Sequence, residues 1–350
     1  MKQIESKNSS ILISLAALFV IVYSLQAAAP LIIPFLLAIF LALITLRPLF
    51  WLQSKKVPAF LAALIIVAVI MLLLLLIGSV LGTSIAEFTA ALPEYQERLD
   101  VILESLMGAA PNYLSSNQTS LNFSQLLDPG WAMSLAASLL NALREVLTNA
   151  FLIMFTMIFI LLEASAFEVK LLAAFKRKRD SFVSQKIFVT NLGRYLGIKT
   201  IMSVATGASV AIATSWIGLD FPLLWGMFAF LLNYVPTIGS IIAAVPAVLM
   251  ALVQLGIGDA VTTAIAFFTI NLVYGNIIEP RLLGYGVGLS PLIVFISLFF
   301  WGWVFGPVGM ILSVPLTMAL KMALESDEQT QWLAIIMGSE DDAQHEIGTK

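Results

Sequence analysis

The chain has 350 residues, of which 60% are hydrophobic and 11% are charged, with a formal net charge of −3. A soluble globular domain carries roughly 25% charged residues, so much of this surface must face lipid. There is no cysteine, and the single histidine, His345, lies in a polar tail. Disulfides and thiolate chemistry are therefore excluded, and a zinc site or a histidine-based catalytic triad lacks support. We expect a membrane protein that is not an enzyme, with no cofactor and no bound metal.

Long apolar runs recur along the chain and predict an all-α polytopic membrane protein embedded in the lipid bilayer, because a membrane-crossing helix needs about 20 apolar residues. The first part, residues 1–82, has runs at 11–29, 30–46 and 59–81. The later part, residues 146–324, has a run that ends near 162 and further runs at 201–219, 221–235, 238–255, 260–278, 289–305 and 308–320. We predict about eight membrane helices, and the short runs indicate re-entrant or broken helices in this C-terminal half.

Residues 83–145 differ from the apolar runs because they carry seven acidic and two basic residues. Pro93 predicts a kink or a new helix start within this segment. Apolar residues recur there at steps of three and four, which predicts a helix packed against another helix: Ile85, Phe88, Leu92, Tyr95, Leu99, Ile102 and Leu106. We expect 83–145 to form a small extracytoplasmic helical module.

The charge changes sign at 164–199, which carries eight lysines and arginines against two acidic residues. A nucleic-acid patch is one interpretation, but the apolar flanks favour a positively charged cytoplasmic loop, so no nucleic-acid partner is expected. With the N-terminus inside, the basic turn at 47–56 is also cytoplasmic and 83–145 is outside. The acidic tail, residues 325–350, then lies in the cytoplasm, as both termini do.

Small residues recur every four positions at Ser203, Gly207, Ala211 and Ser215. Such a face lets two helix backbones approach closely in lipid. We expect it to be a packing face, rather than the lining of a substrate path.

A polar segment interrupts two apolar runs at residues 233–240. Backbone groups freed at membrane depth must bond to protein or to water in a cavity, and broken helices of this kind form substrate sites in transporters. A plain turn between two helices at the membrane surface is an alternative to a substrate site, and the sequence favours neither. The candidate site residues here are Asn233, Pro236, Thr237 and Gly239.

A second interruption follows at residues 271–288. An ionisable residue at the border of an apolar core is a functional candidate, although an interfacial arginine paired with Glu279 is the alternative. A third joint, around Gly306 and Pro307, predicts a tight connection between helices. The candidate site residues of the second interruption are Asn271, Asn276, Glu279, Pro280, Arg281 and Gly284.

Several linked motifs resemble the autoinducer-2 exporter family over roughly residues 10–325. They are Asn233-Tyr-Val-Pro-Thr-Ile-Gly-Ser240, Asn276-Ile-Ile-Glu-Pro-Arg281, Leu289-Ser-Pro291 and Trp301-Gly-Trp303-Val-Phe-Gly306-Pro-Val-Gly309, with Ile33-Pro-Phe35, Arg47-Pro-Leu49 and Leu92-Pro-Glu-Tyr95 in the first half. The resemblance implies a permease of the bacterial cell inner membrane that moves a small hydrophilic solute. Some members are linked to export of the quorum-sensing signal autoinducer-2 and others to sodium/proton antiport. The resemblance also implies a homo-oligomer, and a pentamer would be similar to what is known of the fold.

Two hypotheses of function remain open. A transporter needs a polar path for a small hydrophilic solute or a cation, with Glu279 as a protonatable coupling group. In that hypothesis Asn233, Thr237, Asn276 and Glu279 line the path, Pro236 and Pro280 break helices, and Gly239 and Gly284 act as joints. An oligomeric membrane scaffold without transport activity is the alternative, in which the module at 83–145 recruits partners.

Overall fold

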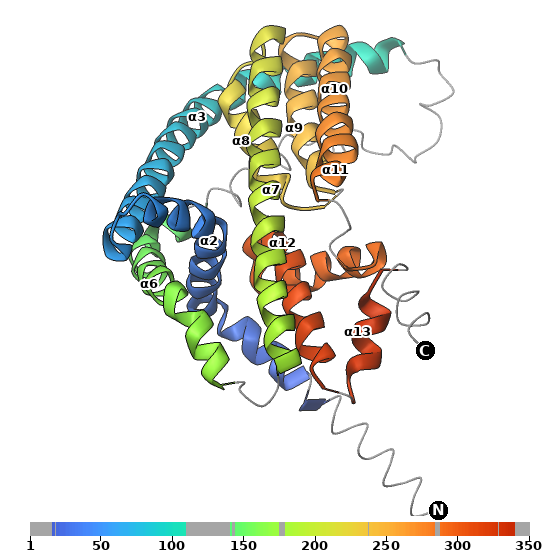
Figure 1. Ribbon diagram of the computed structural model, residues 1–350. Helices are drawn as coiled ribbons and strands as arrows, with labels where there is room; N and C mark the ends of the chain where they lie inside the picture. Colours follow the sequence, from blue (N-terminus) through green and yellow to red (C-terminus); the bar gives the residue numbers. More distant parts are fainter. Residues whose placement is uncertain are drawn as a thin grey trace, which may run out of the picture. The chain divides into compact units, whose positions relative to one another are not determined.

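The computed structural model describes residues 16–17, 19–109, 141, 144–174, 179–236, 238–283, 288–327 and 329–339. Every regular element in these ranges is a helix (Figure 1). The chain forms two compact units. Unit 1 contains residues 1–68, 148–196 and 287–350, and unit 2 contains residues 69–147 and 197–286.

Five helical stretches of the described chain are long and apolar enough to cross a membrane: Ala29–Ser54, Ala59–Ser84, Val189–Ile217, Ile257–Leu283 and Pro291–Glu325. Three shorter apolar helices accompany them, at Ala150–Ala164, Pro222–Leu232 and Ile238–Gln254. The protein is therefore an all-α polytopic membrane protein, which confirms the prediction from the apolar runs.

In unit 1, α2 (Ala29–Ser54) packs against α6 (Ala150–Ala174). The buried residues of α6 recur every fourth position, at Ile153, Met157 and Leu161. A second row with the same spacing, Phe151, Phe155 and Phe159, is exposed; the first two rings stack, and the last two meet edge to face. One face of α6 thus packs against protein, while the exposed aromatic row suits contact with lipid.

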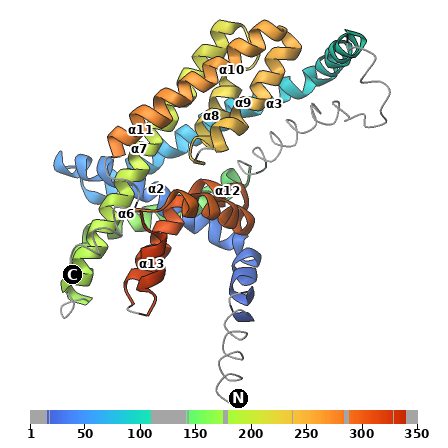
Figure 2. The same cartoon turned by 90° about the vertical axis from the view of Figure 1, so that its right-hand side faces the viewer.

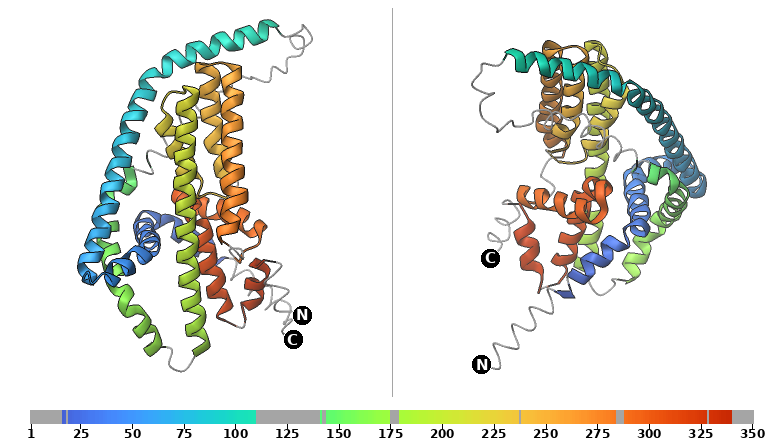
Figure 3. Two further views of the ribbon diagram at one scale, coloured as in Figure 1. Left: turned by 45° about the horizontal axis from the view of Figure 1, so that its top comes forward. Right: turned by 180° about the vertical axis from the view of Figure 1, so that it is seen from behind.

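Unit 1 also contains α12 (Pro291–Glu325), which is broken at Gly306, where φ is 63° and ψ is −149°. The Trp301 carbonyl lies so close to Gly309 that a Cβ atom at 309 would overlap with it. Residues eight apart in an unbroken helix are about 12 Å apart, so the chain turns back here (Figure 3). This confirms the predicted joint. The short helix α13 (Gln331–Met337) then returns to the start of α12, where Ser290 N donates to Met337 O at 3.0 Å.

In unit 2, the end of α7 (Arg179–Ile217) is followed by α8 (Pro222–Leu232), α9 (Ile238–Gln254) and α10 (Ile257–Asn271). These helices run alongside one another (Figures 1 and 2). A π-helix, η1 (Leu272–Ile278), and the short α11 (Glu279–Leu283) continue the last of them. The core of the unit includes Trp225, Phe228 and Phe267. At 11 residues α8 is about 16 Å long, shorter than a hydrocarbon core of about 30 Å, and it forms a helical hairpin with α9.

The packing face predicted on α7 lies against α8. A Cβ atom at Gly226 of α8 would lie 2.6 Å from Gly207 O and 2.7 Å from Ala211 Cβ. The two backbones therefore meet at a pair of glycines, which confirms the packing role of Gly207 and Ala211. Ser215, by contrast, is exposed.

The helix α3 (Ala59–Ala109) runs from the second apolar segment into the region predicted as an extracytoplasmic module. Of the two outcomes predicted for Pro93, a new helix start is not found, because α3 continues through this residue. Packing of Tyr95 in the core of unit 2 stabilises the helix beyond the proline. The Tyr95 hydroxyl also donates to Asp220 Oδ2 at 2.8 Å. Residues 110–140 of the predicted module lie outside the described residues.

Candidate functional site

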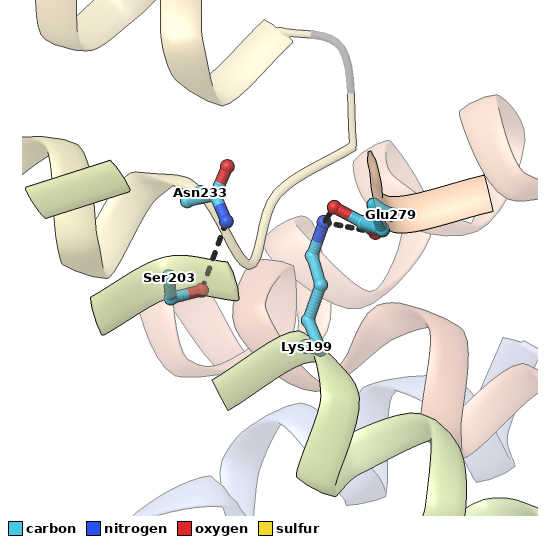
Figure 4. Close-up of polar contacts among 4 residues, drawn as sticks. All are labelled: Lys199, Ser203, Asn233 and Glu279. Atoms are coloured by element: carbon cyan, nitrogen blue, oxygen red, sulfur yellow. Dashed lines mark hydrogen bonds and ion pairs between the residues drawn. The ribbon is translucent and has the colours of Figure 1, made fainter. Parts of the chain in front are cut away.

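A polar cluster lies within unit 2, between α7, the turn from α8 to α9, and the η1–α11 junction (Figure 4). Its residues on α7 are spaced by four and three, so they share one helix face. Lys199 is 6% exposed, Ser203 0% and Thr206 5%. Polar groups buried in an apolar environment are costly unless they are hydrogen-bonded or paired. Because burying these polar groups is costly, we take this cluster as the candidate functional site of unit 2.

An ion pair between Lys199 and Glu279 is the centre of the cluster. Lys199 Nζ lies 2.7 Å from Glu279 Oε1 and 3.0 Å from Oε2, and the two side chains are 8% and 12% exposed. A buried pair adds little net stability, but removing one partner strands a charge and costs about 3–5 kcal/mol. The pair is thus better explained by a function than by a gain in stability.

The turn from α8 to α9 is fastened to α7 by two side chains. Asn233 Nδ2 donates to Ser203 Oγ at 3.0 Å, and the Tyr234 hydroxyl donates to Thr200 Oγ1 at 2.9 Å. Gly239 is required in this turn, because a Cβ atom there would overlap with the Leu232 carbonyl. Backbone groups of the turn are satisfied locally, as in the 2.9 Å bond from Val235 N to Leu232 O. The polar side chains are therefore free to bind α7.

The π-helix η1 contributes a further hydrogen bond to α7, through Tyr274. Ser209 donates to the Tyr274 hydroxyl at 3.1 Å. The ring of Pro280 is the local cause of the wide turn, because a proline clashes with the carbonyl four residues earlier. At Gly275 a Cβ atom would lie 3.2 Å from Asn271 Oδ1, so the Asn271 amide lies over this glycine. Turns of π-helix are rare and frequently occur at functional sites.

Thr206 is the least satisfied group of the cluster. Its hydroxyl oxygen is buried and has no hydrogen-bond partner among the residues that the structure describes. A buried hydroxyl without a partner costs about 1–3 kcal/mol. Thr206 lies on α7 between Lys199 and Ser209, the two residues that bond to α11 and η1. A hydroxyl in this position suits a bound water or a polar group of a solute.

The structure brings some of the predicted site residues into the cluster and leaves others outside it. Asn233 and Glu279 belong to it, Gly239 is buried in the turn, and Pro236 and Asn271 are half-buried near it. Asn276, Pro280 and Arg281 are exposed. Thr237 and Gly284 lie outside the described residues. The alternative pairing of Glu279 with Arg281 is not found, because the ion pair of Glu279 goes to Lys199.

Sequence reasoning missed the whole contribution of α7. It assigned Lys199 to a basic loop and Ser203 to a packing face, and it did not consider Thr206, Ser209 or Tyr274. One signal was present, because Lys199, Ser203 and Thr206 share the helical spacing of one face. Among the described residues, no group of histidine, aspartate and glutamate is suited to hold a metal ion.

The apolar helices, the α8–α9 hairpin and the buried polar cluster together define a polytopic membrane protein with a polar site inside one of its units. A family model described as AI-2E family transporter matches residues 11–327. The chain therefore belongs to the AI-2E transporter family.

Individual relatives cover nearly the whole chain. The AI-2 transport protein TqsA of Escherichia coli K12 is 37% identical over 331 residues, which span 93% of this chain and 95% of the relative. A putative transport protein of Haemophilus influenzae is 36% identical, with 95% and 97% of the two chains covered. The putative transport protein YhhT of E. coli K12 is 34% identical, with 96% of each chain covered.

Proposed function

We propose that this protein exports a small hydrophilic solute across the bacterial inner membrane, and that autoinducer-2 is the first substrate to test. The similarity to a relative named for AI-2 transport supports this choice of substrate. The observation that carries the proposal is the buried Lys199–Glu279 pair, held between otherwise apolar helices. Fold and family alone do not determine a substrate.

The solute path runs along the polar face of α7. Ser203, Thr206 and Asn233 offer hydroxyl and amide groups that can exchange hydrogen bonds with a hydroxylated solute. The Thr206 hydroxyl, which has no partner among the described residues, supports this role, since a solute group would remove its desolvation penalty. Thr237 and Asn276 extend the lining, Pro236 and Pro280 interrupt the helices, and Gly239 and Gly284 act as joints.

Glu279 is the coupling group of this proposal. A proton on its carboxylate would remove the attraction to Lys199 and free both side chains to bind other partners. The sequence carries no ATP-binding motif, so the energy would come from an ion gradient or from downhill flow of the solute. In the same proposal both termini lie in the cytoplasm, and the protein forms a homo-oligomer, for which a pentamer is the first arrangement to test.

Sodium/proton antiport is the second candidate function. The supporting observation is that Glu279 accepts both of its described bonds from one cation, the Lys199 ammonium group. An inorganic cation could take the place of that ammonium group at the carboxylate.

A transport assay in proteoliposomes tests these candidates. We expect purified protein to give autoinducer-2 flux above that of empty liposomes. If that flux is absent but the protein moves sodium and protons, the antiporter replaces the exporter. Absence of both activities would contradict the transport path proposed here and would favour the scaffold.

A further inference from the structure

The π-helix determines which charged residue of α11 faces α7. The backbone N–H of Glu279 donates to Tyr274 O, five residues earlier, which is the bond of a π-turn. Glu279 therefore lies directly above Tyr274 on the helix. Both side chains bond to α7, Tyr274 to Ser209 and Glu279 to Lys199.

An ordinary α-helix over the same residues would present a different charge. With about 3.6 residues per turn, the residues above Tyr274 are those four and seven positions later. These are Ile278 and Arg281. Glu279, five positions later, would lie about 140° away from Tyr274. Rewinding η1 from π to α therefore exchanges Glu279 for Arg281 on the face that is opposite Lys199.

We propose that η1 is a joint with two registers. In the π register Glu279 pairs with Lys199, and in the α register Arg281 takes its place on this face. The inference rests on the proposed function for its role in transport, where the joint links the charge on Glu279 to the conformation of the helix.

The residues around the joint make both registers accessible. Pro280 has no backbone N–H in either register, so rewinding loses no hydrogen bond at this residue, and its ring favours the π register that the structure shows. Gly275, in the middle of η1, adds backbone freedom at the same place. Arg281 is exposed in the π register and has a long side chain, so it can move without losing a buried partner.

The charge on residue 199 selects the register. In the native chain the α register would bring Arg281 toward Lys199, and two like charges would oppose it. The π register instead pairs Lys199 with Glu279. Neutralising Glu279 removes its attraction to Lys199 and so weakens this preference. Lys199→Glu should invert the preference, because the new carboxylate repels Glu279 and attracts Arg281.

The first experiment uses this inversion in full-length protein in detergent. In the Lys199→Glu background, Arg281→Gln should lower the melting temperature by several degrees, because it removes the new partner. In the native background the same Arg281→Gln change should leave the melting temperature nearly unchanged. The opposite pattern, in which Glu279→Gln stabilises Lys199→Glu while Arg281→Gln has no effect, would overturn the proposal.

The second experiment does not require Lys199→Glu to fold. Deleting Ile277 would place Glu279 four residues after Tyr274, so a regular α-turn would keep Glu279 above Tyr274 and opposite Lys199. Deletion of Ile277 should therefore preserve the melting temperature and abolish flux, because only one register remains. The matched control, Ile277→Ala, keeps the residue count and should retain flux.

Comparing flux in the Ile277 deletion variant and in native protein distinguishes failure of the joint from failure of the proposed function. A deletion variant that transports as well as Ile277→Ala would overturn the role of the joint in transport. If the native protein itself moves neither autoinducer-2 nor cations, the proposed function fails. The melting temperatures of the Lys199→Glu series would still decide whether two registers exist.

Discussion

Lys199 on α7 and Glu279 at the start of α11 are 80 residues apart in the chain, yet their charged atoms lie 2.7 Å apart. Both side chains are almost completely buried in a unit that consists mainly of apolar helices. The relationship explains why two charges are tolerated there, because each neutralises the other.

The pair predicts strongly non-additive effects on stability. Lys199→Met should lower the free energy of unfolding by about 3–5 kcal/mol, because it leaves the Glu279 carboxylate buried without its partner. The double variant Lys199→Met/Glu279→Gln should recover most of this loss. Thermal unfolding in detergent measures both variants. A double variant as unstable as the sum of its single variants would contradict the account.

The hairpin turn of α8 and α9 predicts that glycine at 239 cannot be replaced. Gly239→Ala should reduce the yield of folded protein and lower the melting temperature, because the added Cβ atom overlaps with the Leu232 carbonyl. Gly197→Ala is the matched control, since a Cβ atom in that helical position would have no atom within 4 Å. It should be neutral or stabilise the protein by up to about 1 kcal/mol. Equal effects of the two changes would show that the turn is not as close as described.

The bond between α3 and the α7–α8 loop predicts that Tyr95 holds the second half of α3 against that loop within unit 2. Tyr95→Phe removes the hydroxyl that donates to Asp220 Oδ2 and should cost about 1.5–3 kcal/mol, the range for a hydrogen bond to a charged group. Tyr23→Phe, at a residue that is 72% exposed, should have almost no effect. Chemical denaturation can measure the difference. A loss below about 0.5 kcal/mol for Tyr95→Phe would argue against this bond.

The architecture follows from hydropathy because each helix in lipid satisfies its own backbone and needs only a long apolar segment. Even the short α8 and the break at Gly306 follow from run length and from glycine next to proline. The pairing of Lys199 with Glu279 does not follow from hydropathy, since it depends on how α7 packs against α11. The sequence does not predict the register of η1 either, because a π-turn and an α-turn are compatible with the same apolar pattern. Lys199 also follows several basic residues in the chain. A count of charges along the sequence cannot distinguish a buried lysine from the lysines of a cytoplasmic loop.

In the proposed function, Glu279 couples solute movement to a proton gradient. The most direct measurement is autoinducer-2 flux in proteoliposomes with and without that gradient, for native protein, Glu279→Gln and the control Asp259→Asn. Asp259 lies in the first turn of α10 and loses the same charge outside the cluster. We predict that the gradient accelerates flux through native protein and Asp259→Asn, and that Glu279→Gln no longer responds to it. A response in Glu279→Gln as large as in native protein would contradict the account.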